Sequence, residues 1–281
     1  MSKYPAPYKI ALLQMDLPFM EIQANLDKAE AMIREAAKNN AALICLPEAF
    51  NTGYDGDQIA VMIKNAEATD GMALRRMCAL AKELSVFIMA PIYLKTNDGE
   101  AENSAFLIDD NGEIIGKASK THPVGDERSL LKRGTEYPVF STRLGKLGML
   151  VCYDSCFPET SRLLALGGAE LILITSAWRG NYYFTEWVTT STACRALDNL
   201  VFVAHVNRVG KTCKGEVDFA GVSQIYNPIG QLIAKLGSYE EAILYADIDL
   251  SRLKEDRAFN TVLTDRHPED YGPIASAYTH K

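Results

Sequence analysis

The sequence lacks long hydrophobic runs and an excess of basic residues. No stretch approaches the roughly 20 consecutive apolar residues of a membrane-spanning helix, and the N-terminus, Met1-Ser2-Lys3-Tyr4-Pro5, lacks the apolar segment of a secretory signal. Lys and Arg number 29 against 36 Asp and Glu, a net charge of −7. This balance argues against nucleic acid as the main partner, because phosphate contacts require a basic face. We therefore expect a cytoplasmic protein that binds neither a membrane nor nucleic acid.

Cysteine is also sparse. Six cysteines in 281 residues are too few for the disulfide framework of a small secreted protein, and no Cys-x-x-Cys pair occurs among them. With 48% apolar and 23% charged residues, the chain has the composition of an ordinary globular enzyme and is long enough to fold without disulfides or metal. No linker rich in Pro, Gly or Ser divides it. We predict one domain over residues 1–281, with the last ~25 residues as a C-terminal tail and with mostly reduced cysteines.

Short apolar runs alternate with helical periodicity near both ends of the chain. Residues 8–13 and 42–46 have the pattern of buried strands, and residues 21–39 between them carry apolar side chains at helical spacing. Strand, helix and strand are most simply a parallel pair joined by a right-handed crossover. The same patterns predict helices at residues 70–84, 158–166 and 186–199, and strands at residues 86–92, 171–175, 201–206 and 242–247.

Hairpins interrupt this alternation in the middle of the chain. Asp110-Asn111-Gly112 separates the runs 102–108 and 114–120, and its Asn-Gly pair supplies the positive φ that a tight hairpin needs. Residues 139–143 and 147–152 repeat the arrangement around Gly145, and a last hairpin is expected around residues 227–230. The order favours an α/β protein with mixed sheets and outer helices, built as two sheet layers or as one large sheet.

Three chemically reactive residues stand at the ends of predicted strands. Glu48 follows the strand 42–46, Lys120 ends the strand from residue 114, and Cys152 ends the strand from residue 147. Ligand sites of open α/β sheets gather beyond strand ends. A cysteine attacks a carbonyl or nitrile carbon as a thiolate, and Glu48 can be its base if burial raises the proton affinity of the carboxylate. Lys120 and the backbone N–H of Tyr153 would then stabilise the oxyanion.

The segments around these residues resemble those of the nitrilase superfamily of carbon-nitrogen hydrolases. Residues 148–159, which contain Cys152, resemble its nucleophile segment, and residues 46–54, which contain Glu48, resemble its general-base segment. Residues 117–122 resemble its lysine segment, and all three match in order and spacing. Residues 176–179 and the stretch from 195–199 through 204–210 are similar to two further blocks, so the likeness covers nearly the whole chain.

The resemblance implies a four-layer αββα sandwich with Glu48, Lys120 and Cys152 as catalytic triad. Glu127 stands where family members have a second glutamate that orients the lysine, and Cys156 stands where many have a basic residue. The implied reaction cleaves a small linear amide or N-carbamoyl compound through a cysteine thioester, releasing ammonia or amine. The resemblance further implies a homodimer or higher homo-oligomer, and we expect no metal and no cofactor.

Several side chains near these segments are candidates for substrate contact. Arg179 follows a strand end, so its guanidinium is expected either to hold a substrate carboxylate in bidentate fashion or to form a surface salt bridge. His122, close after the lysine, is expected in a loop at the entrance. The full set of candidates is Tyr54, Tyr153, Trp178, Arg179 and His122.

Other residues have a simpler structural interpretation. Cys156 is expected to be a buried or pocket-lining thiol rather than a metal ligand, because no histidine lies nearby. His205, within an apolar run, is expected to be a core or interface side chain with satisfied hydrogen bonds. One face of the helix 186–199 indicates core packing, although in the family this region often packs between subunits; this face carries Trp187, Thr190, Cys194 and Leu197.

Three alternatives remain open at this stage. The same triad could hydrolyse nitriles. A metal-dependent phosphodiesterase on a similar sandwich would draw ligands and base from Glu48, Asn207 and the stretch 265–267, and would need a divalent ion. A non-catalytic binding protein that kept the fold is the third alternative.

Overall fold

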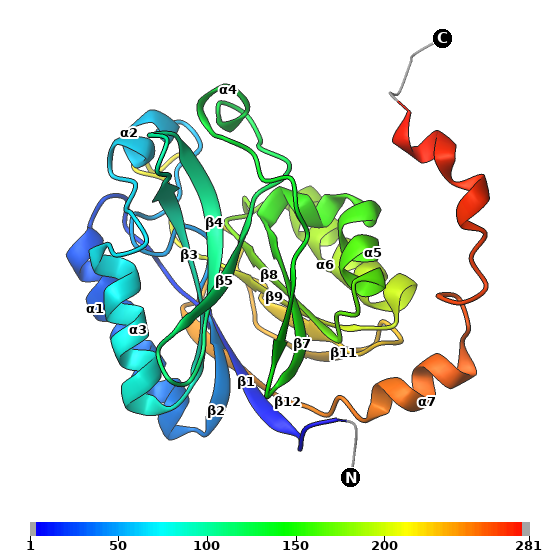
Figure 1. The fold of residues 1–281 in the computed structure, drawn as a ribbon. Helices are drawn as coiled ribbons and strands as arrows, with labels where there is room; N and C mark the ends of the chain where they lie inside the picture. The colour runs from blue at the N-terminus through cyan, green and yellow to red at the C-terminus, as the bar shows by residue number, and fades with distance from the viewer. Residues whose placement is uncertain (1–3, 277–281) are drawn as a thin grey trace.

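Two six-stranded sheets pack face to face between two layers of helices (Figure 1). The structure is a computed structural model, which describes residues 4–276. The first sheet has the strand order β12-β1-β2-β3-β4-β5, and the second has the order β11-β10-β9-β8-β7-β6. Helices α1 and α3 cover the outer face of the first sheet, and α5 and α6 cover the outer face of the second (Figure 1). The predicted αββα sandwich is confirmed.

The first sheet combines a parallel core with antiparallel edges. Strands β1, β2 and β3 run parallel, as the strand-helix-strand pattern predicts. Strands β4 and β5 form an antiparallel hairpin in which Gly112 adopts the expected positive φ of 81°. Strand β12 closes the other edge against β1. The elements are β1 (Tyr8–Gln14), α1 (Ile22–Lys38), β2 (Ala41–Cys45), α2 (Ile59–Lys64), α3 (Met72–Leu84), β3 (Phe87–Lys95), β4 (Ala101–Ile108), β5 (Ile114–Ser119) and β12 (Ala242–Ile248).

The second sheet repeats this plan. Strands β7, β8 and β9 run parallel, and the hairpins β6–β7 and β10–β11 form antiparallel edges. Helix α5 begins with Pro158, whose fixed φ suits the first helical position. Helix α6 begins four residues before the predicted start, because Asn181 Oδ1 accepts a 3.0 Å bond from Phe184 N–H and caps it. The elements are β6 (Val139–Thr142), β7 (Gly145–Val151), η1 (Cys152–Cys156), α5 (Pro158–Leu166), β8 (Leu171–Ser176), α6 (Tyr182–Asn199), β9 (Phe202–Asn207), β10 (Gln224–Tyr226) and β11 (Leu232–Lys235).

The central strands are buried on both faces. In β1, Ile10 and Leu12 pack between the sheets, whereas Ala11 and Leu13 pack against α1 and α3. Strands of this kind have continuous apolar runs instead of alternating ones, which is why short apolar runs were a reliable signal here. All six cysteines are free thiols. Among the described residues, no helix combines the length and apolar character needed to cross a membrane.

Helix α6 turns a different face inward from the one its apolar residues predict. Trp187 is 44% exposed and Leu197 is 46% exposed, and the same face carries the exposed Thr190 and the half-buried Cys194. The prediction that this face packs in the core is therefore wrong. The buried face is largely polar, and Thr192, Arg195 and the Asn199 amide nitrogen form hydrogen bonds there. It consists of Val188, Thr192, Arg195, Ala196 and Asn199.

The C-terminal segment runs past the outside of α5 and α6 (Figure 1). It begins with α7 (Arg252–Phe259), a helix that was not predicted, anchored by the fully buried Leu253. The predicted tail follows and contains two short 3-10 turns, η2 (Pro268–Asp270) and η3 (Gly272–Ala275).

Candidate active site

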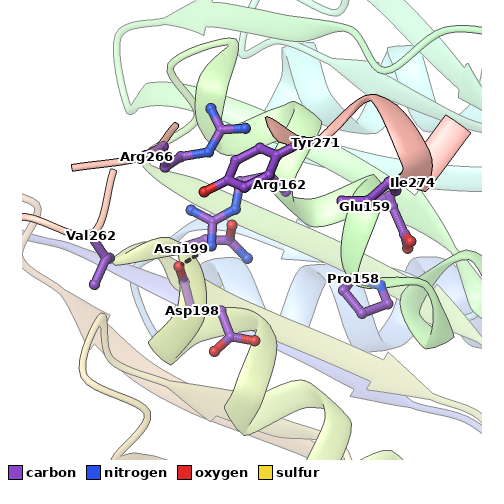
Figure 2. A pocket seen from close by; sticks show the side chains of 9 residues that line it. All are labelled: Pro158, Glu159, Arg162, Asp198, Asn199, Val262, Arg266, Tyr271 and Ile274. Atoms are coloured by element: carbon purple, nitrogen blue, oxygen red, sulfur yellow. Dashed lines mark hydrogen bonds between the residues drawn. The ribbon is translucent and has the colours of Figure 1, made fainter. Parts of the chain in front are cut away.

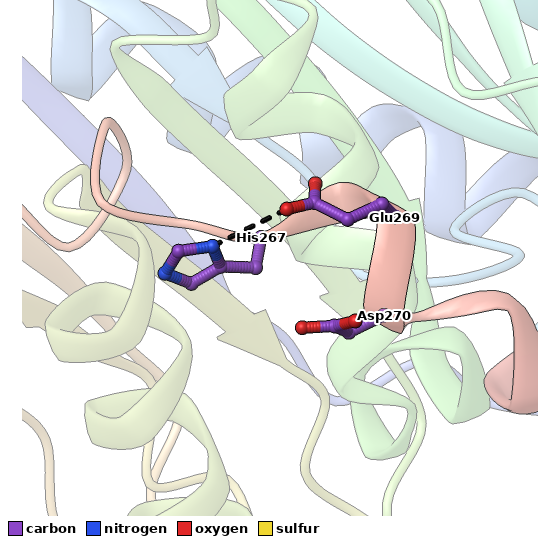
Figure 3. A group of neighbouring side chains, drawn as sticks. All are labelled: His267, Glu269 and Asp270. Carbon is purple, nitrogen blue, oxygen red and sulfur yellow. Dashed lines mark hydrogen bonds and ion pairs between the residues drawn. The ribbon is translucent and has the colours of Figure 1, made fainter.

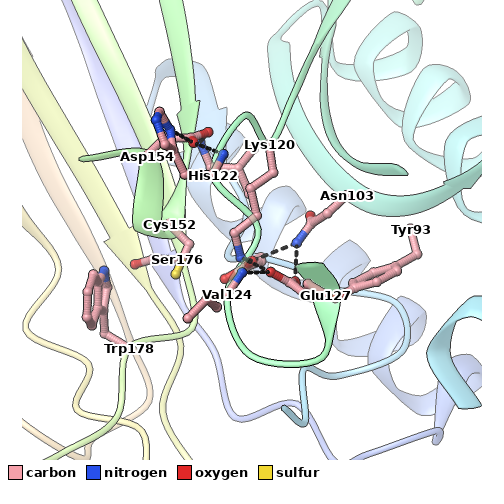
Figure 4. A network of polar contacts seen from close by, with 12 residues as sticks. Tyr93, Asn103, Lys120, His122, Val124, Glu127, Cys152, Asp154, Ser176 and Trp178 are labelled. Atoms are coloured by element: carbon pink, nitrogen blue, oxygen red, sulfur yellow. Dashed lines mark hydrogen bonds and ion pairs between the residues drawn. The ribbon is translucent and has the colours of Figure 1, made fainter. Parts of the chain in front are cut away.

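Four polar residues from separate parts of the chain meet at one edge of the sandwich. Glu48 follows β2, Lys120 follows β5 and Cys152 opens η1 directly after β7. Glu127 comes from α4 (Glu127–Leu130), a short helix that was not predicted. The carboxyl ends of β2 and β5 lie at the same edge of the first sheet, because both strands run parallel to β3. Cys152 reaches this edge from the second sheet, so the site lies where the sheets meet (Figure 4).

Lys120 is held between two carboxylates. Its Nζ lies 3.0 Å from Glu48 Oε1 and 2.8 Å from Glu127 Oε2, and all three side chains are buried (Figure 4). Burial acts to lower the pKa of Lys120, but the charges of Glu127 and Glu48 outweigh it and raise the pKa well above its ordinary value. Lys120 therefore stays positively charged over the working pH range.

Asn103 and Tyr93, which the sequence pattern did not predict as site residues, complete this network. Asn103 Nδ2 donates to Glu48 Oε1 at 2.7 Å and to Glu127 Oε1 at 3.3 Å. Tyr93 O–H donates to Glu127 Oε1 at 2.8 Å, and the N–H of Val124 donates to Glu127 Oε2 at 3.0 Å. Both oxygens of Glu127 are thereby occupied. One feature could have identified Asn103 as a site residue: its side chain is polar, although it lies in a strand that is buried along its whole length.

Glu48 keeps one oxygen free of these contacts. Oε1 is bound by Lys120 and Asn103, but Oε2 is buried and has no N–H or O–H partner in the described chain. The negative charge of the carboxylate acts on the nearby Cys152 thiol and raises its pKa. A buried carboxylate with one uncommitted oxygen beside a thiol is arranged to accept a proton from it.

Cys152 sits on a strained turn. Its φ of 49° lies in the left-handed region, which is unfavourable for a residue other than glycine and recurs at functional sites. Burial raises the pKa of the Cys152 thiol well above its ordinary value, and the negative charge of Glu48 adds to this, while Lys120 and a hydrogen bond from Ala177 N–H oppose it. The resting group is therefore a thiol, which must lose its proton to attack.

Asp154 links the turn at Cys152 to the segment that follows Lys120 through hydrogen bonds. Its Oδ1 accepts from the N–H of His122 at 2.8 Å and from the Thr121 hydroxyl at 2.8 Å, and it lies 2.9 Å from His122 Nδ1. The His122 ring also stacks on Phe157, with 3.7 Å between ring centroids. The structure thus places His122 between Asp154 and Phe157, and not among the side chains that line the adjacent pocket.

A pocket of about 430 Å³ opens onto Cys152. Four of the predicted contact residues, Tyr54, Tyr153, Trp178 and Arg179, line it. Arg179 is exposed and makes no ion pair within residues 4–276, so the surface salt bridge considered for it does not form. The remaining wall combines small, apolar and acidic residues, namely Gly56, Asp57, Val124, Gly125, Asp126, Ala177 and Phe184.

Two buried basic residues form hydrogen bonds with segments that line or adjoin the pocket. Arg208 donates to the carbonyls of Tyr54 at 2.9 Å and Leu17 at 2.6 Å, and burial lowers its pKa to about 10. His205 is 1% exposed and contacts Ser176 Oγ through Nε2 at 2.7 Å and Thr192 Oγ1 through Nδ1 at 2.9 Å. The prediction of a satisfied core histidine is confirmed, and burial lowers its pKa to about 3.

The residues named for the phosphodiesterase alternative do not form one ligand group in the described chain. Among residues 4–276, the group of His, Cys, Asp or Glu side chains close enough to share an ion is His267, Glu269 and Asp270, exposed in the C-terminal segment (Figure 3). Glu48 does not belong to it. Asn207 is committed elsewhere, since it accepts from Trp178 N–H at 2.8 Å and donates to the Gly221 carbonyl at 2.9 Å.

Known proteins resemble this chain over most of its length. The carbon-nitrogen hydrolase family profile matches residues 9–258. A probable nitrilase of Schizosaccharomyces pombe is 32% identical over 272 residues, covering 95% of this chain and 98% of the relative. The omega-amidase NIT2 of Mus musculus is 29% identical over 273 residues, covering 94% and 96%.

Solved structures share the fold over nearly the whole chain. A carbon-nitrogen hydrolase from Helicobacter pylori G27 superposes with a TM-score of 0.86 at 26% identity, covering 97% of this chain and 100% of the other. A variant of the amidase from Nesterenkonia sp. AN1, which carries the acetamide moiety of fluoroacetamide on its active-site cysteine, superposes with a TM-score of 0.82 at 27% identity, covering 95% and 96%.

Proposed function

This chain belongs to the carbon-nitrogen hydrolase family of the nitrilase superfamily, and we propose that it is a thiol amidohydrolase acting on small linear amides or N-carbamoyl compounds. The observation that carries the proposal is the uncommitted Oε2 of Glu48 beside the Cys152 thiol. The relatives include a probable nitrilase as well as an omega-amidase and an amidase, so their names support hydrolysis of a carbon-nitrogen bond, and the choice of amides over nitriles is part of the proposal.

The first half of the reaction forms a thioester. Glu48 takes the proton of Cys152 as the sulfur adds to the amide or carbamoyl carbon. The proton moves within the site, so the buried region gains no net charge at this step. Lys120 Nζ and the N–H of Tyr153 stabilise the resulting oxyanion. Protonated Glu48 then donates to the departing ammonia or amine as the C–N bond breaks.

The second half uses the same carboxylate. Glu48 accepts a proton from water, whose oxygen attacks the thioester carbon. The C–S bond then breaks as Glu48 returns this proton to the sulfur, which releases the acid and restores the thiol. Glu127 is unsuited to be the base, because Lys120, Asn103, Tyr93 and Val124 occupy its oxygens. Its role is to position Lys120.

The pocket rim supports a substrate that carries a carboxylate. Arg179 is the cation that lines the pocket, and its guanidinium is not neutralised by an ion pair in the described chain. Arginine binds carboxylates through two parallel hydrogen bonds. Linear ω-amides of dicarboxylic acids and N-carbamoyl amino acids both place a carboxylate some distance from the cleaved bond.

The exposed apolar face of the outer helices supports a homodimer as the assembly. Helix α6 exposes Tyr183, Trp187 and Leu197, and the adjoining α5 exposes Leu163 and Leu166. Exposed apolar side chains that gather on one face are typical of protein interfaces. A second copy packed on this face would bury them.

Ammonia release from a panel of substrates tests the function. The panel contains ω-amides, N-carbamoyl amino acids, carbamoyl amines and nitriles, and the variants are Cys152→Ala and, as matched control, Cys78→Ala on α3. We expect turnover of amide or carbamoyl substrates by the parent and by Cys78→Ala, and none by Cys152→Ala. Full activity of Cys152→Ala would contradict the mechanism. No turnover of any substrate, together with an unreactive Cys152, would favour a binding protein instead.

A further inference from the structure

A second pocket, of about 300 Å³, lies between the C-terminal segment and helices α5 and α6 (Figure 2). Arg162 comes from α5, Asn199 ends α6, and Arg266 and Tyr271 come from the C-terminal segment. None of these residues takes part in the reaction proposed above. The pocket therefore forms a separate site, built where two distant parts of the chain meet.

Arg162 has more hydrogen-bond donors in this pocket than partners. Its Nη2 donates to the Asp198 carbonyl at 2.6 Å, but its Nη1 is buried and has no partner in the described chain. A buried charged donor without a partner is unfavourable by several kcal/mol in typical cases. Burial lowers the pKa of Arg162, and the charge of Arg266 lowers it further. The charge of Asp198 opposes these effects, but its carboxylate forms no ion pair with Arg162 in the described chain, so Nη1 is left without a partner.

Arg266 brings a second cation to the same pocket. Its guanidinium carbon lies 5.1 Å from the centroid of the Tyr271 ring, which Figure 2 shows between the guanidinium groups of Arg266 and Arg162. Neither arginine makes an ion pair within residues 4–276. Two like charges drawn together without a counter-charge repel each other unless an anion lies between them.

The acidic residues at the rim do not neutralise the pair. Asp198 has a 51% exposed side chain, and its carboxylate lies 3.8 Å from a different arginine, Arg195. Glu159 is exposed at the start of α5 and makes no ion pair in the described chain. Apolar contacts are available as well, because Val262, Tyr271 and Ile274 line the pocket.

We propose that Arg162 and Arg266 bind the oxyanion group, carboxylate or phosphate, of a small molecule whose body contacts Tyr271 and Ile274. The planar guanidinium of each arginine matches such groups through paired hydrogen bonds. A bound anion would bridge α5 and the C-terminal segment and hold that segment against the helices.

Calorimetric titration at low salt tests the site, with inorganic phosphate and benzoate as probes. The parent protein is expected to bind at least one probe with a Kd of about 1 mM or tighter. Arg162→Gln and Arg266→Gln are each expected to weaken binding by at least about tenfold. The control Arg75→Gln, an exposed arginine on α3, should leave the Kd unchanged. Binding of phosphate alone or of benzoate alone supports the site and identifies the preferred group.

A second measurement separates binding from folding defects. Amide exchange over residues 260–276 should slow when the probe is added to the parent and stay unchanged in Arg266→Gln. Thermal unfolding without a probe and amide turnover check that each variant is folded. Failure of both probes to bind the parent, or equal binding by Arg162→Gln and the parent, overturns the proposal. So does a change in self-association in the arginine variants without anion binding, because a second copy would then fill the pocket.

Discussion

Asn103 Nδ2 lies 2.7 Å from Glu48 Oε1, the oxygen that Lys120 Nζ also holds at 3.0 Å. The two donors hold Oε1 and leave Oε2 as the oxygen without a partner in the described chain. The orientation of the proposed base therefore depends on a residue that takes no proton and lines no part of the pocket.

Asn103→Ala should lower kcat by roughly 10- to 100-fold, because a hydrogen bond to a charged group contributes about 1.5–3 kcal/mol. KM should change little, since Asn103 does not line the pocket. Steady-state kinetics measure both quantities. Asn65→Ala, an exposed residue after α2, is the control. An unchanged kcat in Asn103→Ala would show that the amide does not orient Glu48.

Removal of metal ions should leave turnover unchanged, whereas alkylation of the protein should abolish it. The mechanism uses a carboxylate, an ammonium and a thiol, and none of these needs an ion. Ammonia release is measured after dialysis against EDTA and, separately, after iodoacetamide treatment. Activity that is lost in EDTA and kept after alkylation would contradict the thiol mechanism and favour a metal enzyme.

Arg179→Gln should lower kcat/KM for carboxylate-bearing amides by about 10- to 100-fold, the range expected for a lost charge-assisted pair. A neutral amide of similar length should be cleaved at the parent rate, because it makes no use of the guanidinium. The measurement is a comparison of kcat/KM for the two substrates in both proteins. Equal losses for both substrates would mean that Arg179 supports the pocket instead of selecting the substrate.

His205 should make the folded state sensitive to acid. Its pKa is lowered from 6.5 to about 3 in the folded chain, so between these values the unfolded chain binds a proton that the folded chain does not. His205 therefore makes its full contribution to the free energy of unfolding above pH 6.5. As the pH falls from 6.5 toward 3, the free energy of unfolding decreases by up to about 1.4 kcal/mol per pH unit.

Urea titrations of the parent and His205→Gln at pH 6 and pH 5 measure this difference. The parent should lose about 1 kcal/mol more than the variant over that pH unit, since glutamine does not titrate. Equal losses would mean that His205 does not carry the effect.

Leu197→Glu should convert a dimer into a monomer, because a charge buried in an apolar interface is strongly unfavourable. Sedimentation velocity measures the change. Met72→Glu is the matched control, since Met72 is 46% exposed on α3, which covers the outer face of the other sheet. A monomeric parent, or a dimer that survives Leu197→Glu, would place the interface elsewhere or remove it.

The local pattern of the chain determined most of its secondary structure. Apolar runs located the central strands because these are buried on both faces, and the Asn-Gly pair located the β4–β5 hairpin because few residues tolerate positive φ. Short helices such as α2 and α4 were missed, since a single turn has too few residues to show a period.

Helix α6 shows where such patterns mislead. The apolar residues Trp187 and Leu197 lie outside, and the polar residues Thr192, Arg195 and Asn199 lie inside. Most of these buried polar groups have partners from distant segments, such as His205 for Thr192 and the Ser155 carbonyl for Arg195. Hydrophobicity alone places such groups outside, because it cannot count hydrogen bonds that form only after folding.

The sequence by itself determined the kind of chemistry: the motifs around Glu48, Lys120 and Cys152 name a base, a cation and a nucleophile. Only the tertiary structure decided which oxygen of Glu48 is free, which residues hold Lys120, and that Arg162 lies near Arg266. The reason is physical. Residue type and local spacing are properties of neighbouring residues, whereas these contacts join segments far apart in the chain and exist only when both sheets have packed.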